Sequence, residues 1–207
     1  VYAPFDQSLA LIAELFVSQV SADRMNEIYN TPTAEGVERF QPKGHDIVFD
    51  HVGFAYDKKK VLDGVNFTAR EGEVTALVGP SGSGKSTCAR LAARLWDVTE
   101  GTIRVGDVDI STVDPEALLT DYSMVFQDVV LFRDTVMENI RLGRRGATDE
   151  EVLEAAKAAQ CDEFIRKLPQ GYQTVIGENG STLSGGERQR ISIARALLKD
   201  APVVLLD

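Results

Sequence analysis

The sequence predicts an α/β protein with a mostly parallel sheet, a small antiparallel β subdomain before it and a helical subdomain within it. Three observations support this fold class. Apolar and polar residues alternate over residues 65–70, a continuous apolar run covers residues 74–78, and helix-period patterns follow at residues 148–167 and 187–199. Because strands that alternate with helices usually form a parallel sheet covered by helices, the order of these segments favours an α/β core.

The first 45 residues are predicted to form a helix and a linker. Apolar side chains recur at helical spacing through residues 1–30. These residues are Leu9, Ile12, Leu15, Phe16 and Val20. Pro32 ends the helix, because a proline disfavours the helical conformation of the residue before it. Residues 33–45 contain two glycines and a proline, which is typical of a linker.

Further segments are predicted to be strands. Residues 65–70 have the alternation of a half-buried strand, whereas Val74–Val78 predicts a strand buried on both faces. Residues 103–110 predict a hairpin whose two-residue turn is Gly106-Asp107. Shorter apolar runs predict two more buried strands, at residues 124–126 and 203–206.

Two helices are predicted in the second half of the chain. Thr148, with Glu151 three residues later, predicts a capping box, in which each side chain bonds the backbone N–H of the other residue. This box opens a helix that reaches about Lys167. The second helix is predicted from about Glu187 to Lys199.

The composition restricts the class of function. The net charge of −10 and the isoelectric point of about 4.8 argue against a general nucleic-acid binder, because such proteins usually present a basic face. Cys88 and Cys161 lie far apart without metal-ligand spacing, so we expect two reduced structural thiols. The chain begins at Val1 instead of Met and stops at Asp207 directly after an apolar run. We therefore expect a C-terminally truncated fragment of a longer polypeptide.

A glycine-rich segment between the strand at residues 74–78 and a helix predicted at residues 88–96 fits the phosphate-loop pattern G-x-x-x-x-G-K-[ST]. Glycines lack a Cβ atom, so the backbone N–H groups can converge on a phosphate. We expect Lys85 to reach the β- and γ-phosphates, Ser86 to give its hydroxyl to Mg²⁺ and Thr87 to contact the α-phosphate side. The expected nucleotide-binding residues are Gly79, Pro80, Ser81, Gly82, Ser83, Gly84, Lys85, Ser86 and Thr87.

This loop predicts a P-loop NTPase core, and by itself it leaves kinases, GTPases and motor ATPases open. A second motif, Leu183–Arg190 with the sequence LSGGERQR, narrows the choice. Ser184 is a good helix N-cap, and Gly185 and Gly186 leave bare backbone in the first turn, so the segment predicts a second anion site. A match to LSGGE arises by chance on the order of once in ten thousand such chains.

With both motifs present, the sequence resembles the ATP-binding-cassette (ABC) family over about residues 46–207. The resemblance implies that two such domains dimerise head to tail. Each ATP, with its Mg²⁺, is then held between the phosphate loop of one subunit and the LSGG helix of the other. The resemblance implies four signature residues facing the ATP of the other subunit, namely Ser184, Gly185, Gly186 and Glu187.

Three further positions match functional residues of the family. Tyr56 stands where the family has an aromatic ring that stacks on adenine, although an isolated tyrosine is more often a core residue. Gln127 matches the glutamine that senses the γ-phosphate through Mg²⁺, although a glutamine at a strand end is more often a surface residue. Asp207 matches the Walker B aspartate, at the strand end where α/β folds bind ligands. The resemblance therefore implies a metal site formed by Ser86, Gln127 and Asp207.

The resemblance also implies functional groups that these 207 residues do not contain. The catalytic base of the family, usually a glutamate, follows the Walker B aspartate, and a dimer-contacting loop and a switch histidine come later. His45 and His51 both precede the phosphate loop, so neither matches that histidine. We therefore expect no catalytic residue in the fragment, with the base just after Asp207. Such a fragment binds ATP but hydrolyses it poorly.

Two segments resemble exporter-type members of the family. Thr174–Gly180 is similar to the segment that precedes LSGG near the membrane domain, with Asn179 in place of the usual arginine. Ser21–Pro32 is similar to the junction between the last transmembrane helix of a half-transporter and its cassette, with an unrelated amphipathic helix as the alternative. The implied domains are the end of that helix with its intracellular extension at residues 1–32, a linker at 33–45 and an incomplete nucleotide-binding domain at 46–207.

The leading functional expectation is ATP binding and, in the intact parent, ATP hydrolysis that powers transport from the cytoplasmic face of a membrane. The expected partners are a second nucleotide-binding domain and the chain's own transmembrane domain, with no nucleic acid. A soluble mechanochemical cassette that clamps nucleic acid is the runner-up, against which the acidic charge argues. An ATP-binding module without turnover is the third option, favoured if the residue after Asp207 is not acidic. These residues leave the cargo and the direction of transport open.

Overall fold

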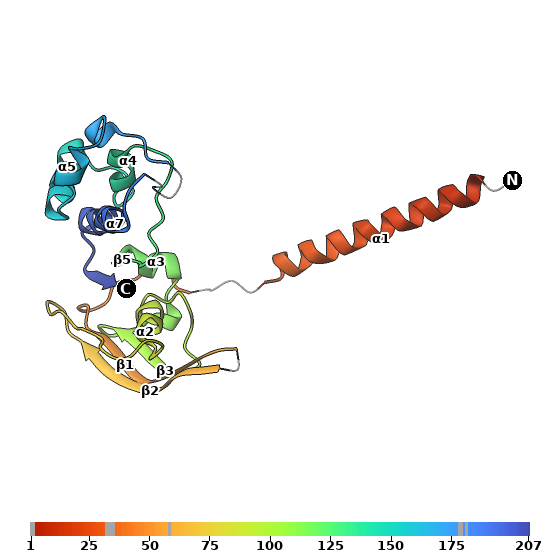
Figure 1. Cartoon of the computed structure of the whole chain (residues 1–207). Coiled ribbons are helices and arrows are strands. Elements are labelled where there is room, and N and C mark those ends of the chain that lie inside the picture. Colours follow the sequence, from red (N-terminus) through yellow and green to blue (C-terminus); the bar gives the residue numbers. More distant parts are fainter. Residues whose placement is uncertain (1–2, 32–35, 58, 178–179, 181) are drawn as a thin grey trace. The chain divides into compact units, whose positions relative to one another are not determined.

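The computed structural model describes all residues except 1–2, 32–35, 58, 178–179 and 181. The chain divides into two compact units, Val1–Ala34 and Glu35–Asp207. The first unit is the helix α1 (Ala3–Tyr29) shown in Figure 1, which confirms the helix predicted at the start of the chain. Its described apolar side chains are exposed. No helix in the described part of the chain is long and apolar enough to span a membrane.

A four-stranded antiparallel sheet forms the β subdomain. Its strands, in spatial order, are β2 (Lys59–Ala69), β1 (Ile47–Tyr56), β3 (Glu100–Val105) and β4 (Val108–Asp109). The predicted alternation holds in β2, where Val65, Phe67 and Ala69 are half-buried and the residues between them are exposed. The predicted hairpin is confirmed by β3 and β4, with Gly106 at φ 57° in the turn. β4 is short because the 3₁₀ helix η1 (Ile110–Thr112) begins directly after it.

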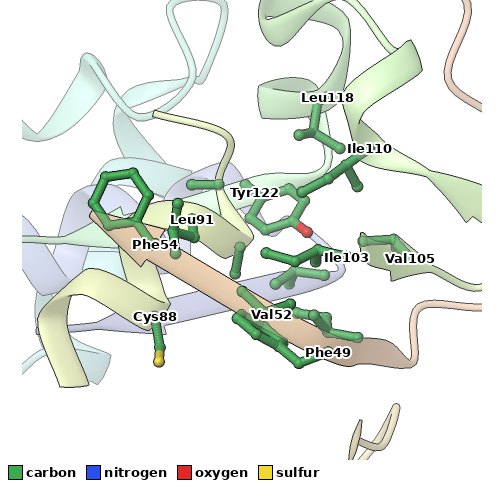
Figure 2. Packing of buried hydrophobic residues seen from close by; sticks show 14 of the residues in the cluster. Phe49, Val52, Phe54, Cys88, Leu91, Ile103, Val105, Ile110, Leu118 and Tyr122 are labelled. Atoms are coloured by element: carbon green, nitrogen blue, oxygen red, sulfur yellow. The ribbon is translucent and has the colours of Figure 1, made fainter. Parts of the chain in front are cut away.

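One face of this sheet packs on helix α2 (Lys85–Ala92) and forms the first hydrophobic core. Figure 2 shows Val52 and Phe54 of β1, Ile103 of β3 and Leu91 of α2 in this core. All four side chains are at most 3% exposed. A fully buried side chain of this size stabilises the fold by about 1.5–3 kcal/mol. The core therefore holds α2, and the loop that leads into it, against the sheet.

A second sheet contains the parallel pair β5 (Tyr122–Val125) and β6 (Val203–Leu206), with α3 (Pro115–Thr120) beside β5. β6 confirms a predicted strand. β5 begins two residues before the strand predicted at residues 124–126 and leaves out Phe126. Its pairing with β6 ends at Val125, whose carbonyl accepts the last hydrogen bond, from the Asp207 N–H at 3.0 Å. Within the described residues the antiparallel sheet is therefore larger than the parallel one, whereas the sequence predicts a mostly parallel sheet.

The predicted strand Val74–Val78 is not formed. All five of its residues are exposed, with Val74 at 99% and Val78 at 88%. A strand needs partners for its backbone N–H and C=O groups, and neither sheet of the described chain includes this segment. Apolar composition alone therefore does not create the strand, because a neighbouring strand must supply the hydrogen bonds.

The helical subdomain surrounds a second hydrophobic core. Its helices are α4 (Val136–Arg141), α5 (Asp149–Ala158), α6 (Asp162–Ile165), the 3₁₀ helix η2 (Gly171–Gln173) and α7 (Gly185–Lys199). α4, α5 and α7 contact one another (Figure 1). Ile140, Val152 and Ile191, one from each of these helices, are completely buried between them.

The capping box predicted at Thr148 and Glu151 is confirmed, with both reciprocal hydrogen bonds present. The helix that it opens ends at Ala158, and the prediction that it continues to Lys167 is wrong. Gln160, at φ 57°, adopts a left-handed conformation that stops the helix, and the chain turns before α6 begins.

Candidate functional site

The phosphate loop leads into helix α2, which begins and ends earlier than the helix predicted at residues 88–96. It begins earlier because the Cys88 N–H already donates to the Gly84 carbonyl at 2.9 Å, and Arg94, at φ 51°, lies beyond its end. Gly84 has φ 88°, a left-handed angle that glycine adopts without strain. A Cβ atom at Gly84 would also lie 2.5 Å from Leu62 Cδ2. The loop therefore packs directly on strand β2, and any other residue at this position would be strained and would displace Leu62.

Lys85 folds back onto the loop that precedes it. Its Nζ donates to the carbonyls of Gly79 at 3.0 Å and Pro80 at 2.8 Å, and lies 3.4 Å from Ser83 Oγ. The ammonium group is thus held against the loop by neutral oxygens. Phosphate oxygens are charged and therefore stronger acceptors. A phosphate bound in the loop would therefore attract the Lys85 ammonium group more strongly than these carbonyls do.

Ser86, in the first turn of α2, donates from Oγ to Asp207 Oδ1 at 2.5 Å. Asp207 directly follows β6. Gln127 lies two residues after the end of β5. Because Val125 of β5 is paired with Leu206 of β6, the two strands end side by side, and Gln127 and Asp207 follow them at the same end of the parallel pair. Gln127 is exposed and forms no hydrogen bond with the rest of the described chain. A hydroxyl and a carboxylate are hard oxygen ligands of the kind that Mg²⁺ prefers, so Ser86 and Asp207, which the structure brings together, fit a Mg²⁺ ion.

Tyr56, the last residue of β1, belongs to an aromatic cluster. Its ring packs edge-on against the rings of Phe54 and Trp96, with distances of 4.7 Å and 5.4 Å between the ring centroids. Phe54 lies opposite Leu62 of β2, the residue that packs beneath Gly84. The cluster therefore lies on the side of the sheet that carries the phosphate loop. The sequence signals Trp96 only as a lone tryptophan at the end of the helix predicted at residues 88–96, and no role was expected for it.

The LSGG motif opens helix α7 with Ser184 as its N-cap, and the helix begins at Gly185, two residues before the predicted start. Ser184 and Glu187 form a second capping box. The Ser184 N–H donates to Glu187 Oε2 at 2.7 Å, and the Glu187 N–H donates to Ser184 Oγ at 3.4 Å. The first of these bonds contributes most to holding the pKa of Glu187 below its usual value. Gly185 and Gly186 are exposed with open space around them. The first turn of α7 thus presents bare backbone.

The role of Glu187 in this box is a feature that sequence analysis missed, although the spacing S-x-x-E signals it. In the described residues no hydrogen bond joins the motif to the phosphate loop. The motif instead belongs to the second core, where Leu183 is 5% exposed. Upstream, Val175 forms a β-bridge with Thr135. Asn179, which replaces the arginine expected from the resemblance, lies outside the described residues.

Comparison with known proteins agrees with the two motifs. A family model described as "ABC transporter" matches residues 62–207. The chain is 44% identical over 207 residues to "Mycobactin import ATP-binding/permease protein IrtB" of Mycolicibacterium thermoresistibile, a match that covers 99% of this chain and 36% of that protein. It is 47% identical over 185 residues to "ATP-dependent lipid A-core flippase" of Syntrophus aciditrophicus, covering 89% of this chain and 30% of that protein.

Among solved structures, a bacterial Atm1-family ABC exporter with ATP bound superposes with a TM-score of 0.85 and 42% identity. The match covers 90% of this chain and 33% of the exporter chain. The chain thus spans about a third of the length of these relatives. The residues matched by the family model contain both the phosphate loop and the LSGG helix, so the chain belongs to the ABC transporter family.

Proposed function

We propose that this chain is the ATP-binding and ATP-hydrolysing domain of an exporter-type ABC transporter, in which ATP use powers transport across a membrane. The direct bond between Ser86 Oγ and Asp207 Oδ1, at 2.5 Å, carries the proposal. It unites a hydroxyl of the phosphate-loop helix with a carboxylate at the end of a parallel strand. Ligands of α/β folds bind at this end of the strands, and the oxygen pair suits Mg²⁺.

The phosphate loop and its lysine bind the triphosphate in this proposal. Backbone N–H groups of Ser81, Gly82 and Gly84 and the N-terminus of α2 face the phosphate oxygens, where the helix dipole favours negative charge. Lys85 exchanges the carbonyls of Gly79 and Pro80 for the β- and γ-phosphates. Thr87, which is 8% exposed, supports the α-phosphate side.

Four other side chains orient the rest of the nucleotide. Ser86 and Asp207 hold Mg²⁺, which neutralises charge on the phosphates when it is bound. Gln127, at the same sheet edge, completes the ligand set and faces the γ-phosphate. Tyr56 stacks on adenine from the end of β1. An aromatic contact of this kind contributes about 0.5–1.5 kcal/mol beyond the area that it buries.

A second nucleotide-binding domain and a transmembrane domain are the proposed partners. The exposed backbone at Gly185 and Gly186 makes no hydrogen bond to the phosphate loop of its own described chain, so it is available to an ATP held by another subunit. The relatives are about three times as long as this chain, and one of them is named a permease. We therefore place the domain at the cytoplasmic face of a membrane, fused to its own transmembrane helices. Because the relatives include both an import protein and an exporter, the proposal concerns transport without its direction.

Turnover in this proposal requires a general base that positions the attacking water. We place this base outside residues 1–207. His45 contacts Asp121 at 3.3 Å, and the exposed His51 contacts Asp50 at 2.6 Å. Both histidines precede the phosphate loop and pair with these carboxylates, so neither is assigned as the base.

The test is Lys85→Ala in the full-length parent, assayed for ATP-dependent transport in proteoliposomes. Loss of the only ammonium group that contacts the described loop should abolish transport. Lys157→Ala, at an exposed position of α5, is the control and should transport normally. Normal transport by the Lys85→Ala protein would refute the proposed function.

A further inference from the structure

An arginine one turn before the end of helix α7 joins that helix to the segment after Gln127. Arg195 Nε donates to the Asn139 carbonyl at 2.6 Å, and Nη2 donates to Asn139 Oδ1 at 2.8 Å. Nη1 donates to the Val130 carbonyl at 2.7 Å. A planar guanidinium group serves all three acceptors at once, which a lysine cannot do. Burial lowers the pKa of Arg195 to about 10, so the side chain remains charged at neutral pH.

Asn139 of α4 extends this network along the same segment. Its side chain is completely buried. Nδ2 donates to the carbonyls of Phe132 and Thr135, both at 2.9 Å, and Oδ1 accepts from the Phe132 N–H at 2.9 Å. One amide thus satisfies both backbone groups of Phe132. Because an unsatisfied buried polar group is costly, residues 130–135 are firmly attached to α4 and α7.

Helices α4 and α7 also lie in close contact at this point. A Cβ atom on Gly143, just after α4, would collide with the backbone carbonyl of Arg195. The backbone of Arg195 therefore packs tightly against Gly143, just after the end of α4.

The network connects two parts of the proposed nucleotide site. Gln127 lies three residues before Val130, and the N-cap Ser184 lies on the same helix as Arg195, eleven residues before it. We infer that Arg195 and Asn139 are positioning residues that attach the Gln127 segment to the LSGG helix, so that the two nucleotide contacts move together. This inference rests on the proposed function, because it assigns a role to residues that act on ATP.

A double-mutant cycle in the full-length parent tests the coupling. The kcat and KM for ATP are measured for the wild type, Arg195→Met, Gln127→Ala and the double variant. If Arg195 acts through Gln127, Arg195→Met lowers kcat by roughly tenfold with little change in KM, and the double variant is no slower than Gln127→Ala. Lys199→Met is the matched control. Lys199 lies one turn later on α7 and donates to the carbonyls of Leu119 at 2.7 Å and Tyr122 at 2.6 Å, away from residues 130–135.

The outcomes separate this inference from the proposed function. Non-additivity of Arg195→Met with Gln127→Ala, together with additivity of Lys199→Met with Gln127→Ala, supports the coupling. Additive effects for both pairs in an active wild type overturn the coupling and leave the proposed function standing. A wild type without ATP turnover overturns both.

A milder variant keeps the test decisive if Arg195→Met does not fold. Asn139→Asp retains an oxygen for Arg195 and for the Phe132 N–H but loses the donor to the carbonyls of Phe132 and Thr135. The same cycle with Gln127→Ala should again be non-additive. Additivity in that cycle overturns the role assigned to Asn139 and with it the attachment of the segment.

Discussion

The hydroxyl of Ser86 and the carboxylate of Asp207 lie within 2.5 Å of each other, although 121 residues separate them in the chain. The bond joins the start of helix α2 to the end of strand β6. It brings the phosphate loop, which packs on the antiparallel sheet, to the edge of the parallel pair. Two oxygen ligands for one cation thus come from different parts of the fold.

Replacing Asp207 with asparagine should weaken Mg²⁺ binding in the presence of ATP. Loss of the charged carboxylate should weaken the free energy of Mg²⁺ binding by about 1.5–3 kcal/mol, which is roughly 10- to 150-fold in affinity for the ion. The measurement is a Mg²⁺ titration of ATPase activity in the full-length parent. Asp200→Asn is the control, because Asp200 is exposed at the C-cap of α7 in a left-handed conformation that asparagine tolerates. Equal Mg²⁺ midpoints for Asp207→Asn and the wild type would contradict the metal assignment.

Alanine at Gly84 should destabilise the parent more than alanine at Gly82. Both glycines have left-handed angles, at φ 88° and φ 79°, so each substitution carries a strain of about 1–2 kcal/mol. Only at Gly84 must the new Cβ displace the side chain of Leu62, which adds about 1–3 kcal/mol. Thermal melts without nucleotide compare the two. Equal melting temperatures for the two variants would show that the loop does not pack on β2 in solution.

The two capping boxes offer a matched pair of variants. Ser184→Ala and Thr148→Ala each remove an N-cap side chain that accepts a backbone N–H, so each should cost about 1 kcal/mol of stability. Only Ser184 lies at the LSGG motif. Ser184→Ala should therefore also reduce ATP-induced pairing of the nucleotide-binding domains, measured by cross-linking, whereas Thr148→Ala should not. A similar loss of pairing in both variants would mean that pairing follows helix stability alone.

The thiols should be unreactive in the folded protein. Cys88 and Cys161 are free and buried, as the sequence predicts, and burial raises the pKa of both thiols, that of Cys161 to about 12. Maleimide labelling at pH 8 should be slow for both until denaturant is added. A thiol whose pKa is raised on folding stabilises the protein below its unfolded pKa of 9.0, and this contribution is lost as the pH rises through the folded pKa. Cys161→Ser should therefore reduce the loss of stability above pH 9, measured by thermal melts. Rapid labelling of native Cys161 would contradict the burial.

Features whose partners lie within a few residues could be predicted from the sequence. The capping box at Thr148, the N-cap at Ser184 and the turn at Gly106 all depend on hydrogen bonds or backbone angles set by close neighbours. The phosphate loop can likewise be predicted from nine consecutive residues, 79–87. Short-range chemistry of this kind does not depend on where the rest of the chain lies.

Only the tertiary structure decided the features that need a distant partner. The run Val74–Val78 has the composition of a buried strand, yet in the described chain it has no strand beside it to satisfy its backbone. The resemblance implies that Ser86 and Asp207 share a metal site, whereas their direct hydrogen bond and the contact of Arg195 with Asn139 depend on packing between residues 121 and 56 positions apart. Sequence patterns report which face of an element is apolar, whereas hydrogen bonds between elements depend on how the elements pack together.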